Sequence, residues 1–363
     1  MKISLRKNFF SDLELPLVEK EGLKASIFRY QSGVEAVRLS NDKGYIIMLP
    51  YKGQMIWEAC FHGRILNMQR VNKKIPKMTD YFLDSYGCYL FHCGPLRMGC
   101  PAADDTHVLH GDLPYADYDS AELVYDTDAV GEYIALTGTY IYNRGFGDCY
   151  EAHPIVKVYK DSSVMEITMR IDNLSYDPME LMYMAHINYR ANDNARMVQS
   201  HSWAPDKMVM RNAIPRHFKV ADDYRVFLNH LQENPSATQI IKPGDQYKPE
   251  ICFHLNQPVC DSEGFAHYLL VQPDGSADFL KYKPAELDHN TRWISKFENQ
   301  CGISLAFPAT ADTEGYNLEK KKGNVKEIAP RGSWQTTILT GCLTGDDVKK
   351  EEAFIDDLMK NED

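Results

Sequence analysis

Apolar and polar residues alternate along several stretches of this chain, and that alternation predicts β-strands. From Met165 to Ile171 every second residue is apolar, and the stretch ends at Asp172 and Asn173, which are typical of turns. Segments rich in β-branched and aromatic residues have the same character: 133–142, 155–159, 268–271, 302–307 and 334–340. Turn residues recur between them, at 43–44, 143–145, 273–275 and 330–332. Short strands joined by such turns predict a β-sandwich or a barrel.

One segment near the end of the chain has a helical period instead. Its apolar residues recur at helical spacing: Val348, Phe354, Ile355, Leu358 and Met359. Because Asp346 or Asp347 can cap the first turn, this segment predicts a short C-terminal helix. We expect the basic run at 320–324 to be a solvated loop tip between strands. No low-complexity linker interrupts the chain, so we expect residues 1–363 to form a single domain.

Composition and charge exclude several classes of protein. Of the 363 residues, 44% are hydrophobic, which is enough for a core, and the net charge of −11 argues against binding to a phosphate backbone. No stretch approaches the ~20 apolar residues that span a bilayer, and we expect no secretory signal. Nine cysteines without a CxxC pair favour free thiols in a reducing compartment. We therefore expect a cytoplasmic protein with neither a nucleic-acid partner nor a membrane partner.

Histidines are the first candidates for chemistry, and His186 is the most informative of them. In a strand, His186 and Asn188 project from the face opposite to Ala185 and Ile187. A buried polar group without a hydrogen-bond partner costs about 1–3 kcal/mol. The two side chains therefore either satisfy one another in the core or line a polar cleft.

Two segments resemble the histidine motifs of the aldose 1-epimerases, the galactose mutarotase family. The Leu-His-Gly sequence at 109–111 follows a Gly-rich, Arg-containing turn at 93–101, and this order resembles the first motif. The His-x-Asn-Tyr sequence at 186–189 follows a strand and an Asn-rich turn, and it resembles the second. Segments from 279 to 334 are similar to the terminal strands of an uncharacterised branch. The likeness covers roughly residues 45 to 343.

The resemblance implies a large antiparallel β-sandwich with a cleft for one pyranose. It also implies an isomerase of carbohydrate metabolism that interconverts the anomers of a free or modified sugar, without a metal or other cofactor. This chemistry needs a base for the anomeric hydroxyl and an acid for the ring oxygen. By similarity His186 is the acid, His110 orients or polarises the sugar, and Arg97 donates from its fork of N–H groups. Further expected sugar-binding residues are Asn188, His107 and Trp293. We expect His110 and His186 to face one cleft.

The sequence departs from the family where the catalytic glutamate usually lies, because that position holds Phe307. A phenyl ring cannot accept a proton, so the base has to come from elsewhere. Glu314, seven residues further on, is the first candidate, and Glu319 and Asp312 are weaker ones. We still expect sugar binding, whereas the interconversion of anomers requires that one of these carboxylates replaces the missing glutamate.

Two alternative functions follow from the same residues. A metal-dependent sugar isomerase would use His107, His110 and His186 with a carboxylate, because imidazole and carboxylate suit zinc or manganese. A sugar-binding relative would keep the pocket and lack catalysis, as Phe307 suggests.

Overall fold

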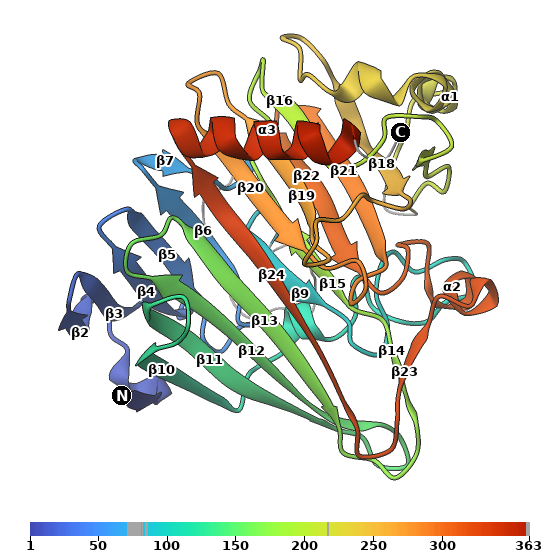
Figure 1. The fold of residues 1–363 in the computed structure, drawn as a ribbon. Coiled ribbons are helices and arrows are strands. Elements are labelled where there is room, and N and C mark those ends of the chain that lie inside the picture. Colours follow the sequence, from blue (N-terminus) through green and yellow to red (C-terminus); the bar gives the residue numbers. More distant parts are fainter. Residues whose placement is uncertain (71–80, 82, 84–85, 216–217, 361–363) are drawn as a thin grey trace.

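Two antiparallel sheets pack face to face and form the body of the molecule (Figure 1). The protein is seen here in a computed structural model, which describes residues 1–70, 81, 83, 86–215 and 218–360. The first sheet has nine strands, in the spatial order β1 (Lys2–Leu5), β10 (Ser120–Thr127), β11 (Glu132–Asn143), β12 (Cys149–Tyr159), β13 (Val164–Asn173), β24 (Ser333–Leu343), β20 (Ala277–Tyr282), β19 (Ala266–Val271) and β16 (Arg196–Gln199).

The second sheet has thirteen strands and carries the candidate site. Its spatial order is β17 (Met208–Met210), β18 (Tyr247–Leu255), β21 (His289–Phe297), β22 (Gln300–Ala309), β15 (Met184–Ile187), β9 (Leu90–Cys93), β6 (Ile56–Phe61), β5 (Gly44–Met48), β4 (Glu35–Asn41), β3 (Leu23–Arg29) and β2 (Leu15–Lys20). Two short strands lie beside this path, β7 (Arg64–Ile65) on β6 and β8 (Gln69–Arg70) on β22. A separate pair is formed by β14 (Met179–Leu181) and β23 (Lys326–Ile328).

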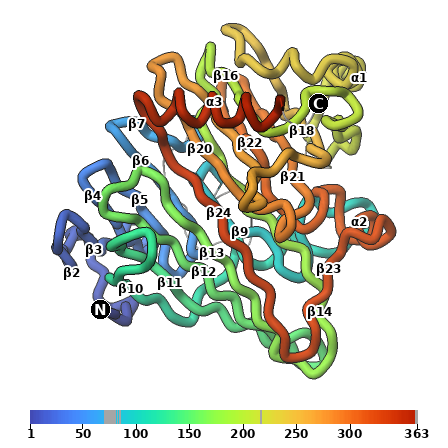
Figure 2. Tube along the Cα trace, viewed as in Figure 1, coloured from blue at the N-terminus to red at the C-terminus, as the bar shows by residue number. Residues whose placement is uncertain are grey.

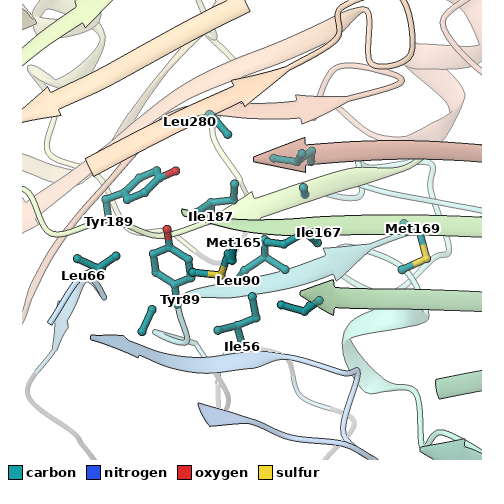
Figure 3. Close-up of a cluster of buried hydrophobic side chains, with 14 of the residues drawn as sticks. Ile56, Leu66, Tyr89, Leu90, Met165, Ile167, Met169, Ile187, Tyr189 and Leu280 are labelled. Carbon is teal, nitrogen blue, oxygen red and sulfur yellow. The ribbon is translucent and has the colours of Figure 1, made fainter. Parts of the chain in front are cut away.

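The core lies between the two sheets and is filled by alternate residues of their strands (Figure 3). In β13, Met165, Ile167 and Met169 are buried, whereas the residues between them face outward. Two tyrosines carry polar atoms into this core, and the hydroxyls of Tyr89 and Tyr189 each lie 2.7 Å from Thr340 Oγ1. The predicted β-sandwich is therefore confirmed, down to the face that each β13 residue occupies.

Three α-helices lie outside the sheets in the described part of the chain (Figures 1 and 2). The expected C-terminal helix is α3 (Asp346–Lys360), which packs Val348 and Ile355 on the outer face of the nine-stranded sheet. The sequence analysis missed α1 (Tyr224–Glu233) and α2 (Tyr316–Lys322). The expected loop tip at 320–324 is wrong over its first residues, because Lys320, Lys321 and Lys322 form the last turn of α2.

No helix among the described residues is both long enough and apolar enough to cross a membrane.

Candidate functional site

The candidate site lies on the face of the thirteen-stranded sheet that points away from the interlayer core. Ala185 and Ile187 of β15 belong to that core, whereas Met184 packs in a second apolar cluster on the other face. His186 projects from this other face, between Phe91 and Phe307. The alternation expected for this strand is therefore present, and it directs His186 away from the sandwich interior.

His186 is enclosed by aromatic rings. Its ring centroid lies 3.8 Å from that of Phe307 and 4.3 Å from that of Phe91, and the Phe91 ring is stacked on it at 23°. Tyr86 and Trp293 meet it edge-on, at 6.0 and 6.1 Å. We call His186, His110 and these four aromatic residues the histidine cluster. Burial lowers the pKa of His186 well below its ordinary value, and the neighbouring His110 lowers it further. The imidazole is therefore neutral near pH 7.

His110 meets His186 from a glycine-rich loop. The two ring centroids lie 5.3 Å apart and the rings are nearly perpendicular, at 82°. The His110 backbone is pinned on both sides, because its N–H donates to Gly99 O and its carbonyl accepts the Gly94 N–H, each at 2.9 Å. The structure therefore brings the two histidines together. Both are nearly buried, with His110 8% and His186 3% exposed.

Gly111 is required for the loop that carries His110 to pack directly against the backbone at Arg97. Its φ is +79°, and a Cβ atom built there would lie 2.0 Å from the carbonyl oxygen of Arg97. We expect Gly111→Ala to lower the free energy of unfolding by about 2 kcal/mol, because the variant meets a left-handed backbone and a backbone clash together. Denaturant unfolding measures this change. Gly145→Ala is the matched control, because no atom lies within 4 Å of a Cβ built there. Equal stabilities of the two variants would contradict the argument.

The other expected sugar-binding residues divide into two groups. Trp293 lies in the histidine cluster, 2% exposed, and Asn188 is buried beside it in the sheet, where its Nδ2 donates to Cys88 O at 2.9 Å. Arg97 and His107 are held elsewhere. Arg97 stacks 3.6 Å above the Tyr316 ring and forms a 3.0 Å ion pair with Glu180, and His107 Nδ1 lies 2.8 Å from Val108 O.

The three carboxylates suggested by the sequence gather around one lysine at α2. Lys322 Nζ lies 2.6 Å from Glu314, 3.0 Å from Glu319 and 3.3 Å from Asp312. Glu319 is fully buried and accepts the Asp312 N–H at 3.0 Å, so it anchors the helix to the preceding loop. Burial raises the pKa of Asp312, but the hydrogen bond of His254 and the charges of His254, His289 and Lys322 together hold that pKa below its ordinary value. Through these contacts the three carboxylates, with Lys322, link α2 to the loop before it.

Solved structures share this arrangement of sheets. A candidate aldose 1-epimerase from Klebsiella pneumoniae matches with a TM-score of 0.78, over 99% of this chain and 96% of its own, at 14% identity. A galactose mutarotase-like protein from Clostridium acetobutylicum matches at 0.63, over 90% and 100%, with 12% identity. A candidate aldose 1-epimerase from Escherichia coli K12 matches at 0.56, over 88% and 100%, also with 12% identity.

This chain has the galactose mutarotase-like fold. The identities are low, so the likeness is one of fold alone. No protein-family model matches the sequence, and no curated protein is similar to it.

Within this fold, Glu250 is a carboxylate at the histidine cluster that the sequence analysis missed. Trp293 Nε1–H donates to Glu250 Oε2 at 2.7 Å, and the other carboxylate oxygen pairs with Arg211. Burial raises the pKa of Tyr86 well above its ordinary value, and the charge of Glu250 raises it further. Glu250 therefore reaches the Trp293 and Tyr86 side of the cluster, and its side chain is only 13% exposed.

Buried cysteines lie on the same face of the thirteen-stranded sheet, and their surroundings disfavour the reactive thiolate. Cys88, Cys93 and Cys252 belong to the apolar cluster around His186. Burial raises the pKa of the Cys93 thiol well above its ordinary value, and that of the Cys100 thiol to about 11. Because the thiolate is the nucleophile and the metal ligand, these cysteines act as small apolar residues near neutral pH.

Among the described residues, His107, His110 and His186 do not come together with a carboxylate at the spacing of metal ligands. Within the described ranges, one group of three His, Cys, Asp or Glu side chains has its ligand atoms within 4.8 Å of one another, and it lies on the other sheet. His107, His110 and His186 are not part of it.

Proposed function

We propose that this protein is an aldose 1-epimerase-like enzyme that interconverts the anomers of a free or modified sugar. The observation that carries the proposal is the imidazole pair of His110 and His186, 5.3 Å apart, in an aromatic cluster that also contacts the Glu250 carboxylate through Trp293. An acid and a base held near one apolar platform are the groups that ring opening and closure require. The galactose mutarotase-like fold agrees with this chemistry.

Each residue then has a definite task. A carboxylate takes the proton of the anomeric hydroxyl, the bond between C1 and the ring oxygen breaks, and the ring oxygen takes a proton from an imidazole N–H and becomes a hydroxyl; both protons return when the ring closes. Because burial keeps His186 neutral, we infer that the N–H of its neutral imidazole is the acid that serves the ring oxygen, as a neutral imidazole does in another isomerase. His110 orients the sugar, and the faces of Trp293 and Phe307 suit the apolar face of a pyranose. Rotation about the opened C1–C2 bond and closure then give the other anomer.

The base is the part of the proposal with two candidates. The sequence favours Glu314, whereas the contact with Trp293 favours Glu250. Both carboxylates hold an ion pair that they would have to exchange for the sugar, Glu314 with Lys322 at 2.6 Å and Glu250 with Arg211, so the contact with Trp293 decides between them. We therefore assign the base to Glu250 and keep Glu314 as its rival.

The remaining sugar-binding residues stay part of the proposal. Asn188 stands beside the cluster and His107 belongs to the loop that carries His110. Arg97 would reach a sugar oxygen by exchanging its ion pair with Glu180, whose side chain is 30% exposed.

A second candidate function is sugar binding without catalysis. It is favoured by the enclosure of His186 between Phe91 and Phe307, which leaves the imidazole 3% exposed. A sugar reaches this imidazole only when the side chains above it move. Sugar binding at the rim of the cluster requires less movement than proton transfer inside it.

Exchange spectroscopy by NMR separates these functions. Purified protein is added to a panel of aldoses and modified sugars, and the rate of exchange between the two anomers is measured with and without it. We expect faster exchange for at least one sugar, lost in His186→Asn and retained after exhaustive chelation. Binding without faster exchange would favour the binding relative. Activity lost on chelation and restored by one divalent ion would favour the metal-dependent isomerase.

A further inference from the structure

On the outer face of the nine-stranded sheet, away from the histidine cluster, one imidazole lies between two carboxylates. Glu151 and His153 are two residues apart in β12, so they project from the same face, and Asp172 of β13 pairs directly with Glu151. Tyr150 and Ala152, the alternate residues of β12, point into the interlayer core. The three side chains therefore face outward from two adjacent strands.

The distances among these side chains match those of a metal site. His153 Nε2 lies 3.2 Å from Glu151 Oε2 and 3.4 Å from Asp172 Oδ2, and all three ligand atoms lie within 4.8 Å of one another. Ligands of a tetrahedral zinc ion, each at about 2.0–2.2 Å, are about 3.4 Å apart. His153 Nε2 therefore lies near that spacing from both carboxylate oxygens, and the two oxygens lie within 4.8 Å of each other.

The surroundings fix the imidazole and one carboxylate. His153 Nδ1 lies 3.2 Å from Thr139 Oγ1, and a hydrogen bond at the second ring nitrogen orients a metal-ligating histidine. Arg170 Nε donates to Asp172 Oδ1 at 2.8 Å, and the Ser333 hydroxyl donates to the same oxygen. Oδ2 is the oxygen that faces His153. The side chains of Glu151, His153 and Asp172 are 30%, 30% and 16% exposed, so an ion can enter from solvent.

We propose that Glu151, His153 and Asp172 bind a divalent transition-metal ion of the zinc type. One imidazole and two carboxylates are ligands that Zn²⁺ accepts, and the two negative charges balance the dication. The three ligands leave a coordination position for water. A bound ion would link β12 to β13 on the face opposite to the histidine cluster. This site is independent of the proposed epimerase function, and it is distinct from the histidine set of the metal-dependent isomerase.

The test is a competition titration of the full chain with Zn²⁺ against a chromophoric chelator. We expect one equivalent of Zn²⁺ to bind, with the affinity lowered at least ~tenfold in His153→Asn, since even second-shell partners are worth that much. His289→Asn is the matched control, because His289 also forms an ion pair, with Asp288 at 3.0 Å, but is not part of the three-ligand group. The affinity of the His289→Asn variant for Zn²⁺ should equal that of the wild type. Absence of binding to the wild type, or binding undiminished in His153→Asn, would overturn the proposal.

A second readout guards against a variant that fails to fold. Zn²⁺ should raise the thermal unfolding midpoint of the wild type and of His289→Asn, but not that of His153→Asn or Glu151→Gln. Because Glu151→Gln keeps the imidazole and the shape of the side chain, it tests the ligand rather than the strand. An equal zinc shift in all four proteins would assign the ion to other residues and contradict the site.

Discussion

Replacing Glu250 with glutamine is expected to slow anomer exchange by about a hundredfold or more, the scale on which general base catalysis operates. Glutamine keeps the shape and can still accept the Trp293 N–H, which reaches this carboxylate at 2.7 Å. It cannot take a proton from the anomeric hydroxyl. The loss should therefore fall on kcat, with KM changed much less, because sugar hydroxyls still find a hydrogen-bonding amide. Exchange spectroscopy at several sugar concentrations separates the two constants.

Two other variants make this result decisive. Glu314→Gln should retain most of the activity, because its carboxylate is bound to Lys322 at α2. The matched control is Glu166→Gln. Glu166 is a partly buried glutamate of β13, on the other sheet, and it forms an ion pair with Lys157 at 2.7 Å. A loss in Glu314→Gln with full activity in Glu250→Gln would transfer the base to Glu314. Because Glu250→Gln leaves the buried Arg211 without its anion, circular dichroism and an unfolding curve must show that each variant is folded.

The sheets were predictable because the period of apolar residues follows from strand geometry. Every second side chain of β13 enters the core, so the alternation from Met165 to Ile171 indicated both the strand and its buried face. The same reasoning failed at α2. That helix has seven residues and is stabilised by tertiary contacts: the Tyr316 hydroxyl donates to the Glu180 carboxylate, and the Asn317 N–H donates to Asp105 Oδ1. Such contacts leave no period in the sequence.

The candidate site was only partly predictable, for a similar reason. His110 and His186 each stand in a local motif, so sequence reasoning could find them and expect them to meet. Glu250 and Arg211 are 39 residues apart and meet because β17 and β18 are neighbours in the sheet. The register of two strands cannot be read from their residues alone, so nothing in the sequence paired this carboxylate with the histidine cluster. The one signal that was present is a glutamate directly before the apolar residues 251–253 of β18.

Another buried histidine, His267, connects α3 to the nine-stranded sheet. Its Nε2 lies 2.8 Å from Asp261 Oδ2 and its Nδ1 lies 2.6 Å from Glu351 Oε1 of α3, with the side chain 3% exposed. Phe354 of the helix covers the ring at a centroid distance of 5.1 Å. Burial raises the pKa of Asp261, but hydrogen bonds from the Phe265 N–H, His267 and Lys281 together lower it below its ordinary value. One imidazole therefore bridges two carboxylates, Asp261 before β19 and Glu351 of α3.

We expect His267→Gln to lower the free energy of unfolding by about 3 kcal/mol, because removing one partner of a buried ion pair takes a hydrogen-bond donor away from a buried carboxylate. The glutamine amide can donate to one carboxylate only, so either Glu351 or Asp261 loses its hydrogen bond to this side chain, and the link between the two is broken. Denaturant unfolding measures the loss, and hydrogen exchange should show faster opening of residues 346–360 than of β13, because α3 depends on this contact directly. Lys350→Gln is the control on the same helix, since its exposed pair with Asp347, at 3.5 Å, is worth less than about 1 kcal/mol. If the two variants are equally stable, or if exchange rises uniformly over both sheets, His267 does not fasten this helix and the apolar contacts of Val348 and Ile355 suffice.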